Sequence, residues 1–351
     1  MAVGFLTKDF SEGASSLIPG GCAYYRCFLP MQASGQDSRM GLPAWTAETG
    51  FGVMAAKDRA QFGFDTVVLK QIMEHNVVHQ IEQAQKLSQR VIVDVDDFYD
   101  GLPETNLAFI ATSPERSKST NRDHYREIIK AADLVIVSTP FLFNYYSKIA
   151  RDIVMVRNGV LPKQFHIRKV RDRKPVIGWV GGVPWRGKDL ETMQEWLPDF
   201  LEDNDLMFHH SGHTDTAASF ADLTGVSPKR VTTSPLQPLD KYHELFTFDI
   251  GIVPLNDIPF NHAKSTLKGL EYASAGIPFV AQGLPEYERL SGMGVGRIAH
   301  TADDWVKQLT ALLDFSTRKK DSRTNFERVV REHTIMAREP EWKQVLKTPN
   351  R

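Results

Sequence analysis

The sequence predicts an α/β protein of two domains, each a mostly parallel sheet wrapped by helices. Apolar segments suited to buried strands alternate with amphipathic helical segments along most of the chain. The alternation stops in a polar, basic stretch at residues 162–174 and restarts at Pro175. The length of 351 residues also fits two domains, since a domain usually has about 100–200 residues.

The composition is that of an ordinary globular protein, with 42% hydrophobic and 24% charged residues. A formal net charge of −1 gives no indication of nucleic-acid binding through bulk charge. Cys22 and Cys27 fit no metal or disulfide pattern. The first twenty residues carry charges, unlike a signal peptide, and no apolar run approaches the ~20 residues of a membrane span. We expect a cytoplasmic protein, with loose contact to a membrane surface left open.

The N-terminal domain is expected at residues 1–161. A glycine turn at Gly20 and Gly21 precedes a helix that begins near Ala23, and residues 32–64 are expected to be irregular with at most short strands. Regular alternation follows, interrupted by an exposed, mobile loop at 102–121. The expected strands are 65–70, 90–95, 134–138 and 153–157, and the expected helices are 72–88, 122–132 and 140–149.

The C-terminal domain is expected at residues 175–318, after the linker 162–174. Its expected strands are 175–180, 206–210, 230–233, 248–255, 277–281 and 295–299, and its expected helices are 189–200, 214–223, 239–246, 263–275 and 302–315. Residues 319–351 form a charged closing helix or pair of helices. Ligands of such sheets bind beyond the carboxyl ends of the strands, so we predict a site in the cleft between the domains.

The predicted helix 263–275 opens with a set of groups suited to phosphate. Its free N–H groups and dipole would lie beside the Lys264 ammonium and the hydroxyls of Ser265 and Thr266. Glu271, two turns further on, is placed to accept hydrogen bonds from a sugar diol. In the alternative interpretation, Lys264 and Ser265 only cap a surface helix.

A glycine loop with two cations follows the strand 175–180. It contains Gly181, Gly182, Arg186 and Lys188, but it matches neither a Walker motif nor GxGxxG. With Lys264 it would supply the positive charge that a departing diphosphate needs, and this can replace a metal ion.

The strand 90–95 ends in acid, and three interpretations compete for Asp94, Asp96 and Asp97. An Asp-x-Asp pair holds a divalent ion in metal-dependent sugar transferases, and it supplies the nucleophile in phosphatases of the haloacid dehalogenase type. The third interpretation, which we prefer, is a carboxylate at the cleft that binds an acceptor or handles its proton. Phe98 and Tyr99 follow the pair, contrary to the phosphatase pattern. A purely structural cap is the remaining alternative.

Three histidines cluster at His209, His210 and His213 and raise the possibility of a metal site. Neighbouring residues on a strand face opposite sides, and no carboxylate pattern accompanies the histidines. We therefore favour a strand-end loop in which Gly212 lets the chain pass a ligand.

The chain resembles glycosyltransferases of the two-Rossmann-domain (GT-B) type, near the retaining glycosyltransferase family 4. The resemblance lies in residues 177–182 (IGWVGG), 253–281 and 137–160, and more weakly in 19–26 and 91–97. It implies a UDP- or GDP-sugar donor, no essential metal or other cofactor, and an unidentified acceptor that is protein, glycan, lipid or DNA. Compact members occur in bacteriophages, which would imply the host cytoplasm.

The resemblance also implies roles for single residues. Gly20 and Gly21 match the glycine loop facing the donor diphosphate, Arg186 or Lys188 matches the phosphate-binding cation, and Glu271 matches the ribose-binding carboxylate. The partner of that carboxylate falls at Ala263 and is absent, which motivates the alternative of a non-catalytic relative. Residues 320–347 match a helix crossing back to the first domain. The predicted catalytic residues are Asp96, Asp97, Arg186 and Lys264; the predicted donor-binding residues are Gly20, Gly21, Gly182, Lys188, Gly212, Ser265, Thr266 and Glu271.

Overall fold

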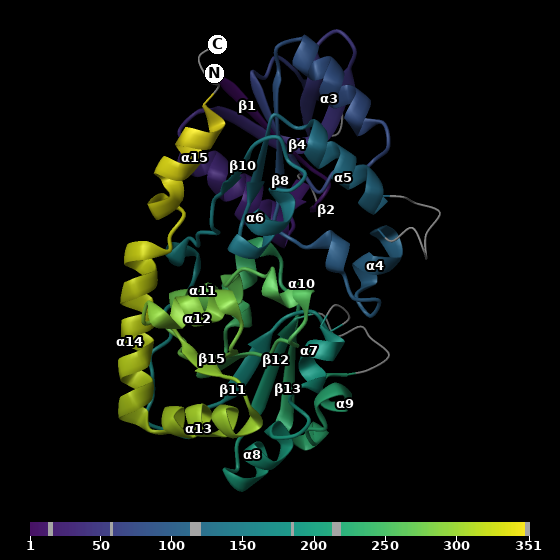
Figure 1. Ribbon diagram of the computed structural model, residues 1–351. Coiled ribbons are helices and arrows are strands. Elements are labelled where there is room, and N and C mark those ends of the chain that lie inside the picture. The colour runs from purple at the N-terminus through teal and green to yellow at the C-terminus, as the bar shows by residue number, and fades with distance from the viewer. Residues whose placement is uncertain (13–16, 57–58, 113–120, 184–185, 213–218, 348–351) are drawn as a thin grey trace.

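The computed structural model describes residues 1–12, 17–56, 59–112, 121–183, 186–212 and 219–347. His213, one of the three clustered histidines, and the first part of the predicted helix 214–223 lie outside these ranges. The chain forms two lobes stacked end to end, each built on one sheet (Figure 1). The predicted two-sheet α/β architecture is therefore confirmed.

The N-terminal lobe contains an eight-stranded sheet in the order β10-β9-β8-β7-β1-β4-β5-β6. Neighbours from β10 to β4 run parallel. The helices α3 (Val77–Lys86) and α5 (Asn121–Ala131) pack on one another beside this sheet. The parallel strands are β1 (Ala2–Thr7), β4 (Asp37–Thr46), β7 (Thr66–Lys70), β8 (Arg90–Val95), β9 (Leu134–Val137) and β10 (Ile153–Met155).

The expectation of irregular structure at residues 32–64 is wrong. The strands β4, β5 (Gly50–Ala56) and β6 (Arg59–Gln61) form an antiparallel extension of the sheet. The glycines that suggested a loop lie where neighbouring atoms come close: a Cβ on Gly41 would lie 2.3 Å from the carbonyl oxygen of Met54. Glycine permits this strand pairing instead of breaking it. Likewise, α4 (Leu107–Thr112) lies within the predicted loop 102–121.

The remaining N-terminal elements are short. β2 (Phe10–Glu12) pairs with β3 (Leu17–Pro19) as a hairpin. A helical segment follows, made of α1 (Gly21–Ala23), a π-helical turn at Tyr24–Phe28 and α2 (Leu29–Ser34). The helix α6 (Pro140–Tyr146) begins after Thr139, whose hydroxyl oxygen accepts a hydrogen bond from the N–H of Leu142 and caps the helix.

The C-terminal lobe contains a six-stranded, all-parallel sheet in the order β13-β12-β11-β14-β15-β16. The predicted helix 189–200 is two short helices, and residues 239–245 form a 3₁₀ helix. The strands are β11 (Ile177–Val180), β12 (Phe208–Gly212), β13 (Val231–Pro235), β14 (Ile250–Val253), β15 (Phe279–Gln282) and β16 (Arg297–Ala299). The helices are α7 (Gly187–Glu191), α8 (Leu197–Asp203), α9 (Phe220–Thr224), α10 (Pro259–His262), α11 (Leu267–Ser274), α12 (Pro285–Gly292) and α13 (Ala302–Leu313).

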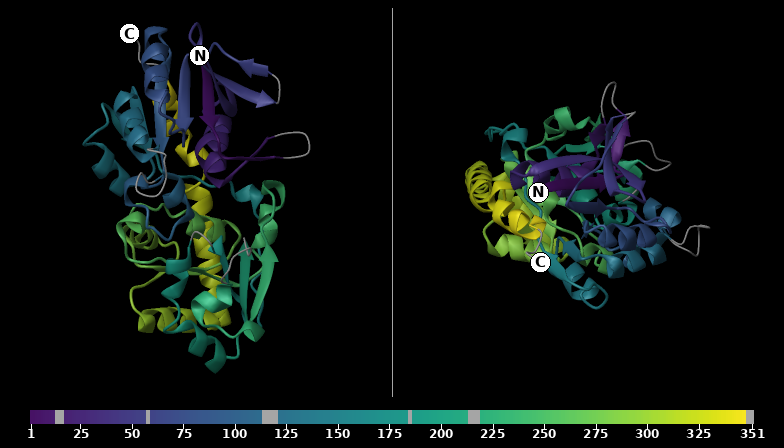
Figure 2. Two further views of the ribbon diagram at one scale, coloured as in Figure 1. Left: turned by 90° about the vertical axis from the view of Figure 1, so that its right-hand side faces the viewer. Right: turned by 90° about the horizontal axis from the view of Figure 1, so that it is seen from above.

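The last two helices connect the lobes. α14 (Phe315–Glu332) packs on α11 and α13, whereas α15 (Glu339–Leu346) packs on α2 of the N-terminal lobe. Trp342 of α15 is buried there, and the guanidinium of Arg26 lies 5.0 Å from its ring centre. The yellow C-terminal segment is accordingly seen in both lobes (Figure 2). The predicted return crossing is confirmed, while the exact boundaries of the linker at 162–174 stay a prediction.

The two passes of the chain between the lobes lie against one another. Val160, on the first pass, donates its N–H to the carbonyl of His333 at 3.0 Å. Ile335 donates to the carbonyl of Val160 at 2.8 Å. Val160 and Thr334 thereby form a short parallel bridge.

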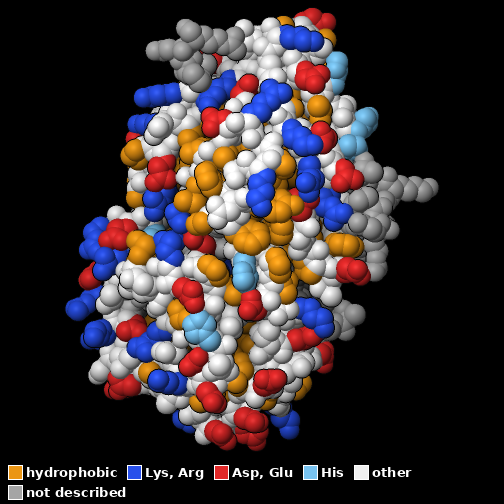
Figure 3. All heavy atoms as spheres, in the orientation of Figure 1, with side chains coloured by type: hydrophobic (Ala, Val, Ile, Leu, Met, Phe, Trp, Pro, Cys, Tyr) orange, Lys and Arg blue, Asp and Glu red, His pale blue; other side chains and the backbone are white. Residues whose placement is uncertain are grey.

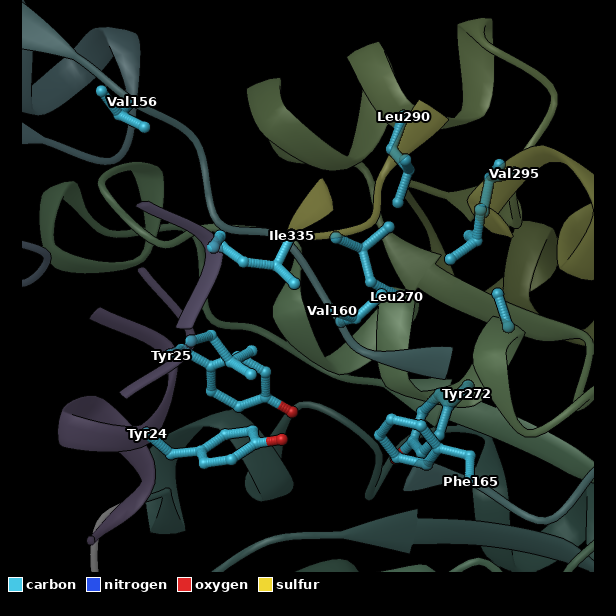
Figure 4. Packing of buried hydrophobic residues seen from close by; sticks show 14 of the residues in the cluster. Tyr24, Tyr25, Val156, Val160, Phe165, Leu270, Tyr272, Leu290, Val295 and Ile335 are labelled. Atoms are coloured by element: carbon cyan, nitrogen blue, oxygen red, sulfur yellow. The ribbon is translucent and has the colours of Figure 1, made fainter. Parts of the chain in front are cut away.

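One apolar cluster contains side chains from both lobes. Figure 4 shows Tyr24 and Tyr25 of the N-terminal lobe on one side and Leu270 and Tyr272 of the C-terminal lobe on the other. A second cluster, the core beneath the N-terminal sheet, takes in Phe260 from the other lobe. The lobes are therefore in close contact, and the carboxyl ends of their parallel strands face the space between them. Among the described residues, no helix is both long and apolar enough to cross a bilayer.

Candidate active site

A cleft of about 390 Å³ lies between the lobes, at the ends of strands from both sheets. The N-terminal lobe contributes the residues after β8 and the glycine turn before α1. The C-terminal lobe contributes the loop after β11, the end of β14 and the face of α11. Its lining includes eight of the twelve predicted site residues: Gly21, Asp96, Asp97, Gly182, Arg186, Lys264, Ser265 and Glu271.

The acidic end of β8 divides into buried and cleft-facing carboxylates. Asp94 is fully buried and accepts a 2.6 Å hydrogen bond from Arg26. Asp96 lines the cleft and pairs with the buried ammonium of Lys70. Burial would raise the pKa of the Asp96 carboxyl, but Lys70 and Arg26 hold that pKa below its ordinary value. Asp96 is therefore a carboxylate at neutral pH.

This arrangement disagrees with a phosphatase that uses Asp94 as nucleophile. The Asp94 side chain has no exposed surface, and Arg26 holds both of its oxygens, at 3.1 Å from Nε and at 2.6 Å from Nη2. A nucleophile must reach a phosphorus atom, and this carboxylate cannot leave the interior without stranding the Arg26 charge.

The thiol of Cys22 and the carboxylates of Asp96 and Asp97 lie close enough to share a cation, with one ligand atom of each within 4.8 Å of the others. Both carboxylates are already paired with a lysine ammonium. Burial and the nearby Asp96 charge raise the pKa of the Cys22 thiol well above its ordinary value, so the metal-binding thiolate is disfavoured. A metal ion here would have to displace two ammonium groups, and the donor set fits one poorly.

Lys264 joins the two lobes across the cleft. Its ammonium pairs with Asp97 and lies 4.3 Å from the ring centre of Phe260. The expectation that residues 263–266 open the helix is wrong. The carbonyl of Ala263 accepts a 3.0 Å hydrogen bond from Thr139 of the other lobe, and α11 begins only at Leu267. Lys264 therefore lies in the loop between α10 and α11.

Ser265 is oriented by a chain of hydrogen bonds from the N-terminal lobe. Arg26 donates to Oδ1 of Asn158 at 2.9 Å, which fixes the orientation of that amide. Asn158 in turn donates from Nδ2 to the Ser265 hydroxyl oxygen at 2.8 Å. Because Ser265 accepts this bond, its own O–H is left to donate elsewhere. Ser265 lines the cleft, so that proton is available to a ligand.

Glu271 is the centre of a polar cluster at the opposite wall. Its Oε1 accepts hydrogen bonds from Tyr25 at 2.8 Å and Tyr242 at 3.0 Å, while Lys268 lies 3.0 Å from Oε2. Tyr25 belongs to the N-terminal lobe and the other three to the C-terminal lobe. Burial and the Glu271 charge raise the pKa of Tyr25 well above its ordinary value, so it stays a hydrogen-bond donor. One acceptor position of Oε2 remains for a ligand hydroxyl.

The glycine loop after β11 contributes one of its two cations. Arg186 lines the cleft and is held by Asp189 at 3.1 Å and by Asn261 at 3.4 Å. Lys188 does not line it: its ammonium pairs with Glu191 at 2.7 Å on the surface. The two are separated because α7 begins at Gly187 and turns Lys188 outward.

Three further predicted residues lie behind the cleft wall. A Cβ on Gly20 would lie 1.9 Å from Oδ1 of Asp9, so this glycine accommodates Asp9, which accepts from the N–H of Ala23. Gly212 has a φ of +144°, and a Cβ at this position would lie 2.1 Å from the carbonyl oxygen of Gly181. Thr266 is buried as the residue before α11. Gly21 differs, because a Cβ there would meet nothing within 4 Å and would point into open space.

The histidines of β12 are structural. His209 shares hydrogen bonds with Thr232 at 2.8 Å and Ser234 at 3.1 Å, and His210 contacts the carbonyl of Gly181 at 3.0 Å. His210 also stacks on Trp179, with 5.1 Å between ring centres. Trp179 and Tyr287 also line the cleft, with 4% and 3% of their surfaces exposed.

Sequence reasoning missed Tyr25, Tyr242 and Lys268 around Glu271, and Asn158 beside Ser265. Lys268 stands three residues before Glu271, a spacing that predicts contact on a helix. The others are separated from their partners by 29 to 246 residues. No periodic pattern signals contacts of that range.

No family model matches this chain. A stretch of 177 residues is 30% identical to a Bacillus subtilis protein that carries the name of a teichuronic acid biosynthesis glycosyltransferase, TuaH; it covers 46% of this chain and 43% of that relative. The chain thus aligns with less than half the length of this relative.

Two solved structures superpose over nearly the whole chain. Sucrose-phosphate synthase from Thermosynechococcus elongatus has a TM-score of 0.66 at 14% identity, with 98% of each chain covered. HepE of Anabaena, in complex with UDP-glucose, has a TM-score of 0.66 at 13% identity, with 99% of each chain covered. At 13–14% sequence identity, the structural similarity establishes only that this chain shares the fold of these two proteins. The predicted GT-B architecture is therefore confirmed.

Proposed function

We propose that this protein is a glycosyltransferase that moves a sugar from a nucleotide-sugar donor to an acceptor hydroxyl. The observation that carries the proposal is that Arg186, Lys264 and the free O–H of Ser265 meet at a cleft that also contains Glu271. Cations and a hydroxyl suit a diphosphate, and a carboxylate suits a ribose diol. The similarity to TuaH supports the same class of reaction.

The proposed donor is a UDP-sugar, with a GDP-sugar as the alternative. Support comes from HepE, which shares the fold and was solved with UDP-glucose. In the proposed complex the diphosphate lies between Arg186 and Lys264, the ribose reaches Glu271, and Trp179 or Tyr287 contacts the base. Gly21 leaves open space on the facing lobe for the same ligand.

We propose that cleavage of the bond between the sugar and the diphosphate depends on preorganised positive charge in the cleft. As the bond from the sugar to the diphosphate breaks, negative charge grows on the departing oxygen, and Arg186 and Lys264 stabilise it. Lys264 pairs with Asp97 in the present structure, so donor binding would transfer this cation from a carboxylate to a phosphate. Asp97 would then be free to accept a hydrogen bond.

The proposal includes retention of configuration and no essential metal ion. In a retaining reaction of this kind the leaving phosphate itself takes the proton of the acceptor. Asp96, with its lowered pKa, is a weak base and suits the task of orienting an acceptor hydroxyl. The pairing of Asp96 and Asp97 with lysines supports a reaction without a metal at this point.

The absent carboxylate at position 263 has a structural reason. Ala263 is 1% exposed and packs in the core of the N-terminal lobe. A glutamate there would be buried among apolar side chains and not in the cleft. The transferred sugar must bind other polar groups, among which Asp97 is the nearest carboxylate to the Lys264 ammonium.

The test is turnover of a panel of UDP- and GDP-sugars, measured as release of the nucleoside diphosphate, with and without a chelator. We expect slow donor hydrolysis that persists in the chelator. Lys264→Ala and Glu271→Ala should each abolish it, and Lys229→Ala, an exposed lysine outside the cleft, should not. Full activity in both cleft variants would overturn the proposal. Nucleotide binding without turnover on any donor or acceptor would instead indicate a non-catalytic relative.

A further inference from the structure

A second groove, of about 700 Å³, lies on the outer face of the C-terminal lobe, away from the cleft lining. One wall is the basic connector at residues 167–170, and the other is the first three turns of α14. Both walls are held to the turn that follows α11: the Ser322 hydroxyl donates to the carbonyl of Gly276 at 2.6 Å, and the N–H of Arg168 donates to the carbonyl of Ala275 at 2.9 Å. Lys and Arg side chains gather at the left edge of Figure 3, over α14.

Every charged residue that lines the groove is basic. The set consists of Arg168, Lys169, Lys319, Lys320 and Arg323. Arg168 lies 3.7 Å from Asp249, and Arg323 lies 3.9 Å from Glu327 on the solvent side. Within the described part of the chain, Lys169, Lys319 and Lys320 are exposed and no carboxylate forms an ion pair with them. The groove therefore presents an uncompensated positive charge in a protein whose overall charge is −1.

The same groove exposes apolar side chains. Ile167 is 60% exposed, a high fraction for isoleucine. Phe315 and Phe326 of α14 line the groove and are half-buried. Val330, one turn beyond Phe326, is 43% exposed. Their spacing puts Phe315, Phe326 and Val330 on one face of α14.

We propose that this groove and the adjoining face of α14 bind the surface of an anionic lipid bilayer. Acidic headgroups would contact the lysines and arginines, and Ile167 and Val330 would enter the boundary between headgroups and acyl chains. A soluble polyanion satisfies only the basic half of the surface and leaves both apolar side chains in water. The combination of basic charge with exposed apolar side chains is what favours a bilayer.

The site is independent of the proposed glycosyl transfer, since none of its residues lines the cleft. It also gives a role to the basic connector at 162–174, which the cleft does not use. In Figure 1, α14 lies at the outer edge of the C-terminal lobe and runs roughly along the long axis of the molecule, so this face is open to a large flat surface.

The test is co-sedimentation of the full chain with phosphatidylcholine vesicles that contain or lack phosphatidylglycerol. We expect binding only to the anionic vesicles, and weaker binding as salt increases. Lys319→Glu/Lys320→Glu/Arg323→Glu should reduce partitioning at least 100-fold, since each basic residue near such a surface contributes roughly a factor of five. The matched control is Lys148→Glu/Arg151→Glu/Lys229→Glu, which makes the same charge change on other exposed residues and should bind far better.

Ile167→Ser tests the apolar half of the site. It leaves the charge unchanged at an exposed position, and it should weaken vesicle binding several-fold while binding of a soluble polyanion, heparin, stays the same. Unfolding midpoints and donor turnover of every variant should match the wild type. The proposal is overturned if anionic vesicles do not bind, if the control triple variant loses as much binding as the groove variant, or if heparin binds and Ile167→Ser leaves vesicle binding unchanged.

Discussion

The substitution Asn158→Asp reverses the direction of one hydrogen bond and thereby tests the proposed role of Ser265. In the wild type, Asn158 donates to the Ser265 oxygen at 2.8 Å, and the Ser265 proton is free to reach a phosphate. In the variant, the retained Oδ1 still faces Arg26, as it does now at 2.9 Å. The new oxygen cannot donate, so Ser265 turns its proton toward it and presents only lone pairs to the ligand.

The expected loss follows from this single bond. A hydrogen bond to a charged acceptor contributes about 1.5–3 kcal/mol, so nucleoside diphosphate binding should weaken roughly 10- to 150-fold. Ser265→Ala removes the same donor and should lose a similar amount. Because Asp adds a negative charge near the ligand, Asn158→Asp is also measured in the Ser265→Ala background, where only the charge effect remains.

The assay is calorimetric titration with whichever nucleoside diphosphate raises the unfolding temperature most, using wild type, both single variants and the double variant. We expect the losses to be strongly non-additive, as for two residues that act through one bond. The reasoning fails if Asn158→Asp binds as tightly as the wild type, or if the two losses simply add. Unchanged unfolding curves would show that the fold is intact in each variant.

The other predictions concern the cleft, the lobe crossing and the buried ion pair. The Gly21→Ala variant should fold normally, because a Cβ at this position has no neighbour within 4 Å, but it should bind the donor measurably more weakly. Gly292→Ala is the control, since a Cβ there also has no neighbour within 4 Å. Equal donor affinity of the two variants would contradict the prediction. Burial and the neighbouring arginines lower the pKa of His333 to about 4. As the pH falls, this histidine therefore binds a proton in the unfolded chain before it does so in the folded protein. The free energy of unfolding should keep its full value above about pH 6.5 and fall by about 3 kcal/mol as the pH approaches 4. His333→Gln should flatten that slope in chemical denaturation at several pH values, and parallel slopes would contradict the assignment. Arg26→Met should cost about 3–5 kcal/mol in unfolding free energy by stranding the Asp94 charge, and Arg26→Met/Asp94→Leu should recover most of it; no recovery in denaturant titrations would contradict the account.

The sequence predicted those parts of the fold in which local pattern and tertiary structure agree. The strands 65–70, 90–95 and 134–138 each contain a continuous run of apolar residues, and each is found as a buried parallel strand. The extension β4-β5-β6 was missed because its glycines, such as Gly41, were interpreted as loop signals. They serve close strand contact, and local propensity does not distinguish the two uses of glycine.

The candidate site was predicted in its components but not in its connections. Chemistry alone indicated Arg186, Lys264 and Glu271, and all three line one cleft. The helix start at residue 263 was wrong because Thr139, from the other lobe, bonds the Ala263 carbonyl and diverts it from helical pairing. The orientation of Ser265 by Asn158 and the tyrosines on Glu271 arise only when the lobes meet.

The short parallel bridge between Val160 and Thr334 restricts how the two lobes can move. The two chain segments that connect the lobes pair with one another at this bridge. We therefore expect the bridge to act as the hinge axis, because chain connectivity opposes rotation about this line least. We expect a small rotation at this bridge to produce a larger displacement further away, so that the Lys264–Asp97 pair separates while the bridge stays intact. Slow amide exchange at Val160 and Ile335, in the presence and absence of nucleotide, would be the signature of such a fixed axis.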